Sequence, residues 1–297
     1  MRYQRVIAEA IRTPWAILPE KLRAIEAMLA DKARGVVYSD EEIQAKISDL
    51  KAERIAQSHG AVAVLPIVGT IVQRADYFTE ISGGVSTERV SRQLRELVAD
   101  DGVKAIILEI DSPGGSVSGV EELAREIFEA KSKKPIVAVA NSMAASAAYW
   151  LASQADEIVV TPTGQVGSIG VYAMHIDYSG SLDKAGVAVS LIHAGKHKVE
   201  GNPYQPLDAE ARGELQRSVD EYYEMFVAAV RRGRGDISSD VMQGRMYSAE
   251  RARRYKLADR VATLDETIAR FTGQVQPARG KRALTSAEIE AMRLQVL

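Results

Sequence analysis

From residue 61 onward, short apolar runs alternate with segments in which apolar residues recur every three or four positions. The first pattern predicts strands and the second predicts helices. Strands are expected at residues 61–72, 103–110, 135–140, 157–160 and 187–193. Helices are expected at residues 86–102, 120–131 and 215–230 and within 141–153. In the first run, Pro66 and Gly69 predict an edge or a bend. The alternation indicates an α/β core with parallel strands and right-handed crossovers.

The pattern divides the chain into three parts. Residues 1–58 predict a helical arm, because Pro19 suits a first helical turn and Ser39 begins a capping box. Residues 59–272 hold the alternating pattern and form the expected catalytic domain. Residues 273–297 are polar and contain proline and glycine, so we expect a flexible tail.

Composition excludes several classes of function. The 297 residues include 38 Lys and Arg against 40 Asp and Glu, and a formal net charge of −2 does not suit a nucleic-acid-binding surface. The absence of cysteine excludes disulfides, thiolate metal sites and thiol catalysis. No run of about 18 apolar residues and no secretory signal is found, so we expect a cytoplasmic protein that does not bind membranes. No metal and no cofactor is predicted.

Two adjacent glycines follow a predicted strand in the segment DSPGGS, residues 111–116. Gly114 and Gly115 allow the backbone to turn with its N–H groups exposed, as in a cradle for an anion or an oxyanion. A tight turn without any ligand explains the same residues equally well. A phosphate loop is disfavoured, because no Lys-Ser/Thr pair follows.

The segment NSMAASAAYW places a serine between alanines where a strand leads into a helix. Ser146 is therefore a candidate nucleophile, since a helix N-terminus stabilises negative charge and small neighbours admit a substrate backbone. The alternative is an ordinary helix start with alanines chosen for packing. Ser142 is expected to cap the helix.

A nucleophilic serine needs a base, and the sequence leaves several candidates open. There is no Gly-x-Ser-x-Gly elbow, so an α/β-hydrolase is not supported. His175, in the strand-like segment VYAMHIDY, is one candidate. Lys196 and Lys198, in HAGKHKVEGNP, are others, because a buried lysine can lose its proton and act as a base.

Five collinear segments resemble signal peptide peptidase A and its relatives, which include the prohead proteases of tailed phages. The resemblance covers roughly residues 61–270 and implies a Clp-protease-like, crotonase-type fold of repeated β-β-α units with a Ser–Lys dyad. The segments are DSPGG, SMAASAAYWLAS, GQVGSIGV, DYSGSLDKAGVAVSLIHAGKHKVEGNP and RMYSAERARRYKLAD.

The resemblance assigns roles residue by residue. The nucleophile falls on Ser146 and the general base on Lys198. Backbone N–H groups of Gly115 and Ala147 form the oxyanion hole, and Ser168 positions the lysine. Family members often have glycines after the nucleophile, where this chain has alanines.

These roles lead to a serine endopeptidase that acts as a homo-oligomer on protein substrates. The phage branch is favoured over a general signal-peptide-peptidase-like enzyme, with capsid or scaffold protein as substrate in the host cytoplasm or procapsid. Three alternatives stay open: a Clp-like peptidase with His175 as base, a crotonase-type enzyme that is not a protease, and an inert structural protein.

Overall fold

The structure, a computed structural model, describes residues 14–23, 57–74 and 84–273. Its strands in the larger sheet are β2 (Gln57–His59), β3 (Val62–Val68), β6 (Ala105–Ser112), β8 (Ile136–Ala145), β9 (Glu157–Val160), β10 (Gln165–Gly167), β11 (Met246–Ser248) and β12 (Arg260–Val261). A smaller sheet contains β1 (Trp15–Ile17), β4 (Ile71–Val72), β5 (Val85–Ser86) and β7 (Gly114–Ser116). The helices are α5 (Thr87–Ala99), α6 (Val120–Ala130), α7 (Ala147–Ala152), α8 (Ser179–Lys184), α9 (Ala209–Arg234), α10 (Ala249–Arg254) and α11 (Leu264–Thr272), with a 3₁₀ turn at Ser239–Met242.

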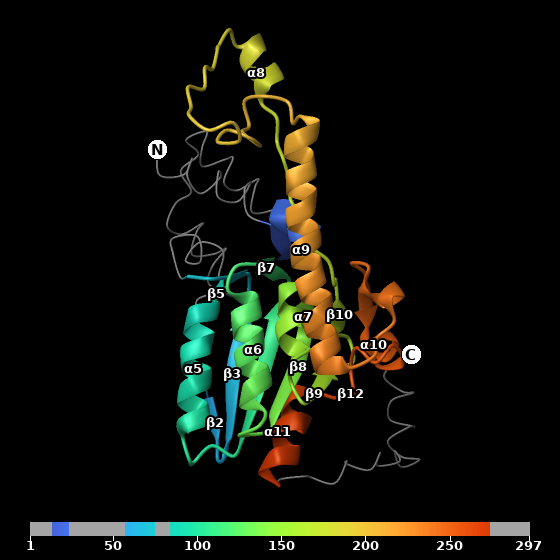
Figure 1. Cartoon of the computed structure of the whole chain (residues 1–297). Helices are drawn as coiled ribbons and strands as arrows, with labels where there is room; N and C mark the ends of the chain where they lie inside the picture. Colours follow the sequence, from blue (N-terminus) through green and yellow to red (C-terminus); the bar gives the residue numbers. More distant parts are fainter. Residues whose placement is uncertain (1–13, 24–56, 75–83, 274–297) are drawn as a thin grey trace, which may run out of the picture.

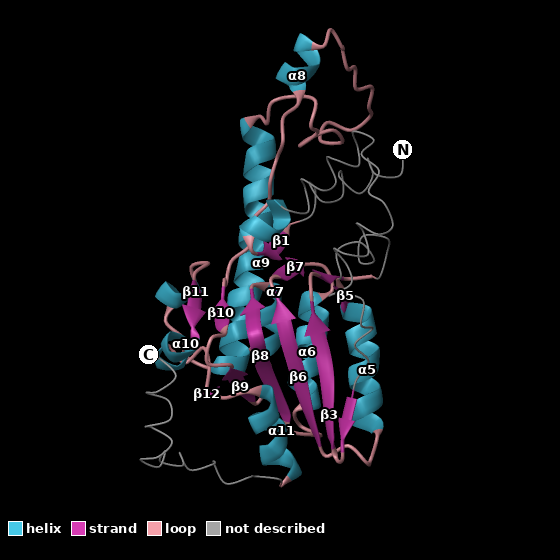
Figure 2. Cartoon of the chain, turned by 180° about the vertical axis from the view of Figure 1, so that it is seen from behind, coloured by secondary structure: helices cyan, strands magenta, loops and turns pink. Residues whose placement is uncertain are grey.

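The centre of the fold is a parallel sheet buried on both faces. Strands β3, β6 and β8 lie side by side in parallel register, and β8 also pairs with β9 and β10 along its other edge. Helices α5, α6, α7 and α9 cover one face, and α11 covers the other (Figures 1 and 2). Their alternating valines and isoleucines therefore face hydrophobic neighbours on either side, as is typical of parallel sheets.

The chain repeats a β-β-α unit, which confirms the predicted fold class. After β3 it enters the smaller sheet at β4 and β5 and returns as α5; after β6 it enters that sheet at β7 and returns as α6. Because β4 and β7 pair with each other, the two units place their short strands together beyond the ends of the parallel strands. The glycine pair predicted as a turn thus forms strand β7.

Two strand predictions need correction. Strand β3 runs through Pro66 without a break, because β2 pairs only with its first residues and Pro66 lies past the end of β2. The strand expected at residues 187–193 is absent. That segment lies exposed beside α8 and meets no strand to pair with, although its sequence has a high strand propensity.

The expected helical arm is described only in residues 14–23. Residues 19–23 are helical and begin with Pro19, as predicted, but residues before them form strand β1. The second helix expected from Ser39, and the tail beyond residue 273, lie outside the described residues.

Helix α9 extends from the body as a projecting arm. Its C-terminal half is buried, with Phe226 stacked on Trp150 of α7 at 4.6 Å between ring centroids. Its N-terminal half carries α8 and residues 185–208 beyond the sheets (Figures 1 and 2). Leu215 and Val219, predicted on an apolar face, are only half-buried there.

An ion-pair network fixes the base of α9. Glu121 of α6 accepts hydrogen bonds from Arg232 at 2.9 Å and from the Trp150 indole at 3.0 Å. Burial of Glu121 opposes its ionisation, but hydrogen bonds from Arg232, Arg125 and Trp150 outweigh burial and hold the pKa of Glu121 below its ordinary value. The network joins α6, α7 and α9.

We expect Arg232→Ala to lower the free energy of unfolding by about 1–2 kcal/mol at neutral pH. Because the folded-state pKa of Glu121 is lowered, this stabilisation is present above the unfolded carboxyl pKa and is lost as the pH falls through the folded value. Urea denaturation at about pH 7 and about pH 3.5 measures both effects. Arg125→Ala, which breaks a more exposed pair with Glu121, is the control and should change stability by under about 0.5 kcal/mol. An equal loss for Arg232→Ala at both pH values would contradict the role of the ion pair.

Candidate active site

Ser146 lies at the turn between β8 and α7 in a strained backbone conformation. Its φ is 55° and its ψ is −121°, a region that residues with a side chain rarely occupy. The Ser146 N–H donates to the Gly167 carbonyl at 2.8 Å, and its Oγ lies 3.4 Å from the Gly170 carbonyl oxygen. The side chain is thereby turned toward the loop after β10. The strand-to-helix placement predicted for Ser146 is confirmed.

Ser142 does not cap the helix, contrary to the sequence prediction. It is an exposed residue within β8 with a φ of 117°, where the pairing of β6 and β8 shifts register. The N-cap of α7 is Ser146 itself, and its side chain makes no capping hydrogen bond. Because the serine oxygen does not cap the helix, it is available for other contacts.

The glycine pair lies against Ser146. A Cβ on Gly114 would come 2.9 Å from Ser146 Cβ and 2.1 Å from the carbonyl oxygen of Ala16, and the φ of Gly114 is +98°. A Cβ on Gly115 would come 1.9 Å from the Ile71 carbonyl oxygen. Only glycine fits at either position.

The two predicted oxyanion donors flank the serine. Ala147 is the first residue of α7, so its N–H has no partner within the helix. Gly115 is in the strand next to Ser146. The alanine methyl groups that replace family glycines are fully buried, so Ala147 and Ala148 pack in the core.

Ser168 lies in the loop that holds Ser146. It follows Gly167, whose carbonyl accepts the Ser146 N–H, and has a φ of 53° and an exposed fraction of 7%. Its own N–H donates to the Arg245 carbonyl at 2.8 Å. The structure therefore brings Ser146, Gly115, Ala147 and Ser168 into one neighbourhood.

Lys198 is not part of that neighbourhood in a single chain. It is exposed, in the segment held near the N-terminus of α9 by the 2.7 Å ion pair of Lys196 with Glu210. Glu210 lies about 24 Å along the helix axis from Phe226, at ~1.5 Å per residue. Because Phe226 packs on α7 one turn after Ser146, the helix separates the lysine from the serine.

Lys196, the alternative lysine, is unsuited to act as a base. The hydrogen bond and charge of Glu210 raise its pKa above the ordinary value and favour the protonated amine. Among the printed interactions of Lys198 there is only its backbone contact with Gly195. This difference agrees with the family assignment of Lys198.

His175 is not placed as a base for Ser146. Its Nε2 lies 3.0 Å from the carbonyl oxygen of Asn202, at the start of the arm. The strand expected around it is also absent apart from a single bridge at Tyr172. The Ser–His alternative therefore has no support in this structure.

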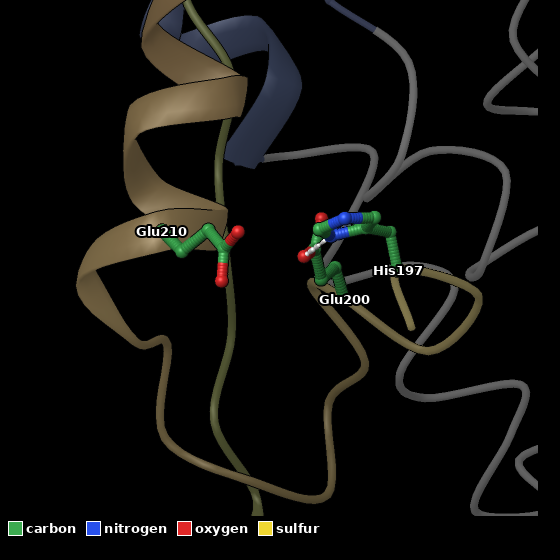
Figure 3. A group of neighbouring side chains, drawn as sticks. All are labelled: His197, Glu200 and Glu210. Carbon is green, nitrogen blue, oxygen red and sulfur yellow. Dashed lines mark hydrogen bonds and ion pairs between the residues drawn. The ribbon is translucent and has the colours of Figure 1, made fainter. Parts of the chain in front are cut away.

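One group of side chains has ligand types suited to a metal. Atoms of His197, Glu200 and Glu210 lie within 4.8 Å of one another (Figure 3). The His197 and Glu200 side chains contact each other, and Glu210 pairs with Lys196. Since its charges are balanced by these partners, the group is explained as the support of the lysine-bearing segment.

Sequence patterns did not reveal that β1 lies beside the serine. Trp15, Ala16 and Ile17 pair antiparallel with β7, which contains both glycines. The available signal was a short apolar run between Pro14 and Pro19, because a residue before proline favours an extended backbone.

Comparison with known proteins was made on this geometry. A model of Peptidase family S49 matches residues 129–276, which include Ser146, Ser168 and Lys198. The Head-tail preconnector protein GP5 of Enterobacteria phage P21 is 33% identical over 253 residues, 80% of this chain and 50% of that protein. Capsid assembly protease C of Escherichia phage lambda is 36% identical over 218 residues, 72% of this chain and 49% of that protein.

The chain thus spans about half the length of these two relatives. Among solved structures, a mutant ClpP1 from Listeria monocytogenes aligns with a TM-score of 0.43 and 16% identity, over 76% of this chain and 98% of that chain. No described helix combines the length and apolar character needed to cross a membrane. The matches confirm the family predicted from the motifs: the chain contains a serine peptidase domain of Peptidase family S49.

Proposed function

We propose that the protein is a serine endopeptidase in which Ser146 is the nucleophile and Lys198 of a neighbouring copy is the general base. Ser146 Oγ attacks the peptide carbonyl while the neutral lysine amine takes its proton. The N–H groups of Gly115 and Ala147 stabilise the oxyanion, and the leaving amine takes the proton from the lysine. Water then hydrolyses the acyl-enzyme. The strained position of Ser146 between these two donors carries the proposal.

Two features support a dyad shared between copies. The length of α9 keeps Lys198 away from Ser146 of the same chain, and Lys198 has no burial of its own. The same arm exposes apolar side chains, with Val187 47%, Val189 41% and Ile192 99% exposed. A second copy packed against the arm would bury these side chains and provide the partner strand that residues 187–193 lack.

The proposed substrates are proteins of an assembling phage head. Two relatives, at 33% and 36% identity, are named a head-tail preconnector protein and a capsid assembly protease. Small residues around Ser146 suit an extended backbone more than a deep side-chain pocket. Capsid or scaffold protein is therefore the substrate we assign.

Co-expression with the capsid and scaffold proteins encoded beside this chain tests the assignment. Wild-type enzyme should shorten at least one of them, and Ser146→Ala should leave all at full length, as judged by intact mass. Unchanged capsid and scaffold masses, with casein still hydrolysed, would replace the head-maturation assignment by that of a general peptidase.

A further inference from the structure

Strand β1 fills the space beside Ser146 in the way that a peptide substrate would. It is an extended segment paired on both of its edges. On one edge, Trp15, Ala16 and Ile17 lie opposite Ser116, Gly115 and Gly114. On the other edge, Trp15 and Tyr172 exchange two backbone hydrogen bonds, of 2.9 and 3.0 Å.

These two edges are the segments that flank the nucleophile. The first is β7, with the glycine pair, and the second follows the Ser168 loop of β10. An extended chain held between them lies directly against the strand-to-helix turn of Ser146. Peptide recognition by added strands uses such main-chain pairing for affinity and pockets for alternate side chains for specificity.

The register points to one carbonyl. The Leu18 N–H donates to Pro113 and the Val117 N–H donates to Pro14, and antiparallel pairs alternate between bonded and non-bonded types. Ala16 and Gly115 stand midway between these two bonds, so they form a hydrogen-bonded pair. The Ala16 carbonyl thus faces the N–H of Gly115, which is the proposed oxyanion donor.

The same carbonyl is close to the nucleophile. The Ala16 oxygen and Ser146 Cβ lie 2.1 Å and 2.9 Å from a single point, the position that a Cβ on Gly114 would take. Among residues of β1, Ala16 is the one whose oxygen has this position in the described contacts. Trp15, Ala16 and Ile17 are 4%, 0% and 2% exposed, so each side chain is enclosed.

We infer that residues 14–18 are a substrate of the enzyme itself, cleaved between Ala16 and Ile17; this rests on the proposed function. Ser146 Oγ adds to the Ala16 carbonyl carbon, and its proton passes to the general base. The C–N bond to Ile17 breaks, and the base returns the proton to the Ile17 nitrogen. Water hydrolyses the Ala16 ester, leaving a carboxylate on Ala16 and a free Ser146. Release of residues 1–16 opens the groove to other peptides.

Intact mass and N-terminal sequencing of purified full-length protein test this inference. The wild-type chain should begin at Ile17, and Ser146→Ala should retain residues 1–16. Ala16→Glu, which places a charge in an enclosed position, should retain them as well. Glu20→Ala, an exposed change just outside the paired segment, should be cleaved as in the wild type.

A synthetic peptide of residues 13–20, TPWAILPE, tests the site without depending on the folding of any variant. Mass spectrometry should find it cut after alanine, and the same peptide with glutamate for that alanine should stay intact. Cleavage of casein together with an intact N-terminus and an uncut peptide would overturn this inference and leave the proposed function standing. Failure to cleave casein, peptide and N-terminus alike would overturn the proposed function itself.

Discussion

Ser146→Ala should lower kcat for peptide-bond cleavage by about 10⁶-fold, the scale seen when a serine nucleophile is removed. The structure gives the reason: Ser146 is held at a strained turn, against the glycine strand and the first N–H of α7. Hydrolysis of fluorescently labelled casein measures the loss. Thermal unfolding of the variant should stay close to that of the wild type, because only one oxygen atom is removed.

The matched control is Ser142→Ala. Ser142 lies four residues earlier in the same strand but is exposed and away from the helix start, so its loss should leave kcat within about twofold. A serine-reactive fluorophosphonate gives a second readout, since its adduct should map to Ser146. An adduct on Ser142 or Ser168, or substantial turnover by Ser146→Ala, would rule out the assigned nucleophile.

Local sequence patterns sufficed for much of the parallel core. Runs such as residues 103–110 are apolar throughout, and a strand buried on both faces requires that pattern. The turn at Ser146 was also predicted, because a strand, a small residue and a helix follow one another directly in the sequence. In each case the information lies within a few adjacent residues.

The errors occurred where structure depends on a distant partner. Strand β1 has three residues and is held by pairing with β7 and Tyr172, contacts that no local pattern encodes. Residues 187–193 have the opposite property, a strand-forming composition without a strand to pair with. Ser142 was misplaced because the register shift in β8 moves the helix start to Ser146.

The candidate site shows the same division. Gly115, Ala147 and Ser168 are brought to Ser146 by strand connections within one chain, so their grouping follows from the fold. Lys198 is assigned by family resemblance alone, and the fold of one chain places it on the arm. The missing step is an assembly of copies, which neither periodicity nor a single chain contains.

A complementation experiment should therefore restore activity from two inactive proteins. Ser146→Ala retains Lys198, and Lys198→Ala retains Ser146, so neither variant alone should cleave casein. In a co-expressed mixture, an interface that joins the intact serine of one copy to the intact lysine of another is complete. Random mixing should restore about a quarter of the wild-type activity, since each interface draws its two residues from different copies.

Two matched variants identify the lysine and its chemistry. Lys196→Ala should keep most activity, because Lys196 is paired with Glu210 rather than free to take a proton. Lys198→Arg should be inactive, because a guanidinium does not lose its proton in a protein. If the mixture of Ser146→Ala and Lys198→Ala stays inactive while sedimentation shows mixed oligomers, the dyad does not form between copies. A bend of the arm would then have to bring Lys198 to Ser146 of its own chain.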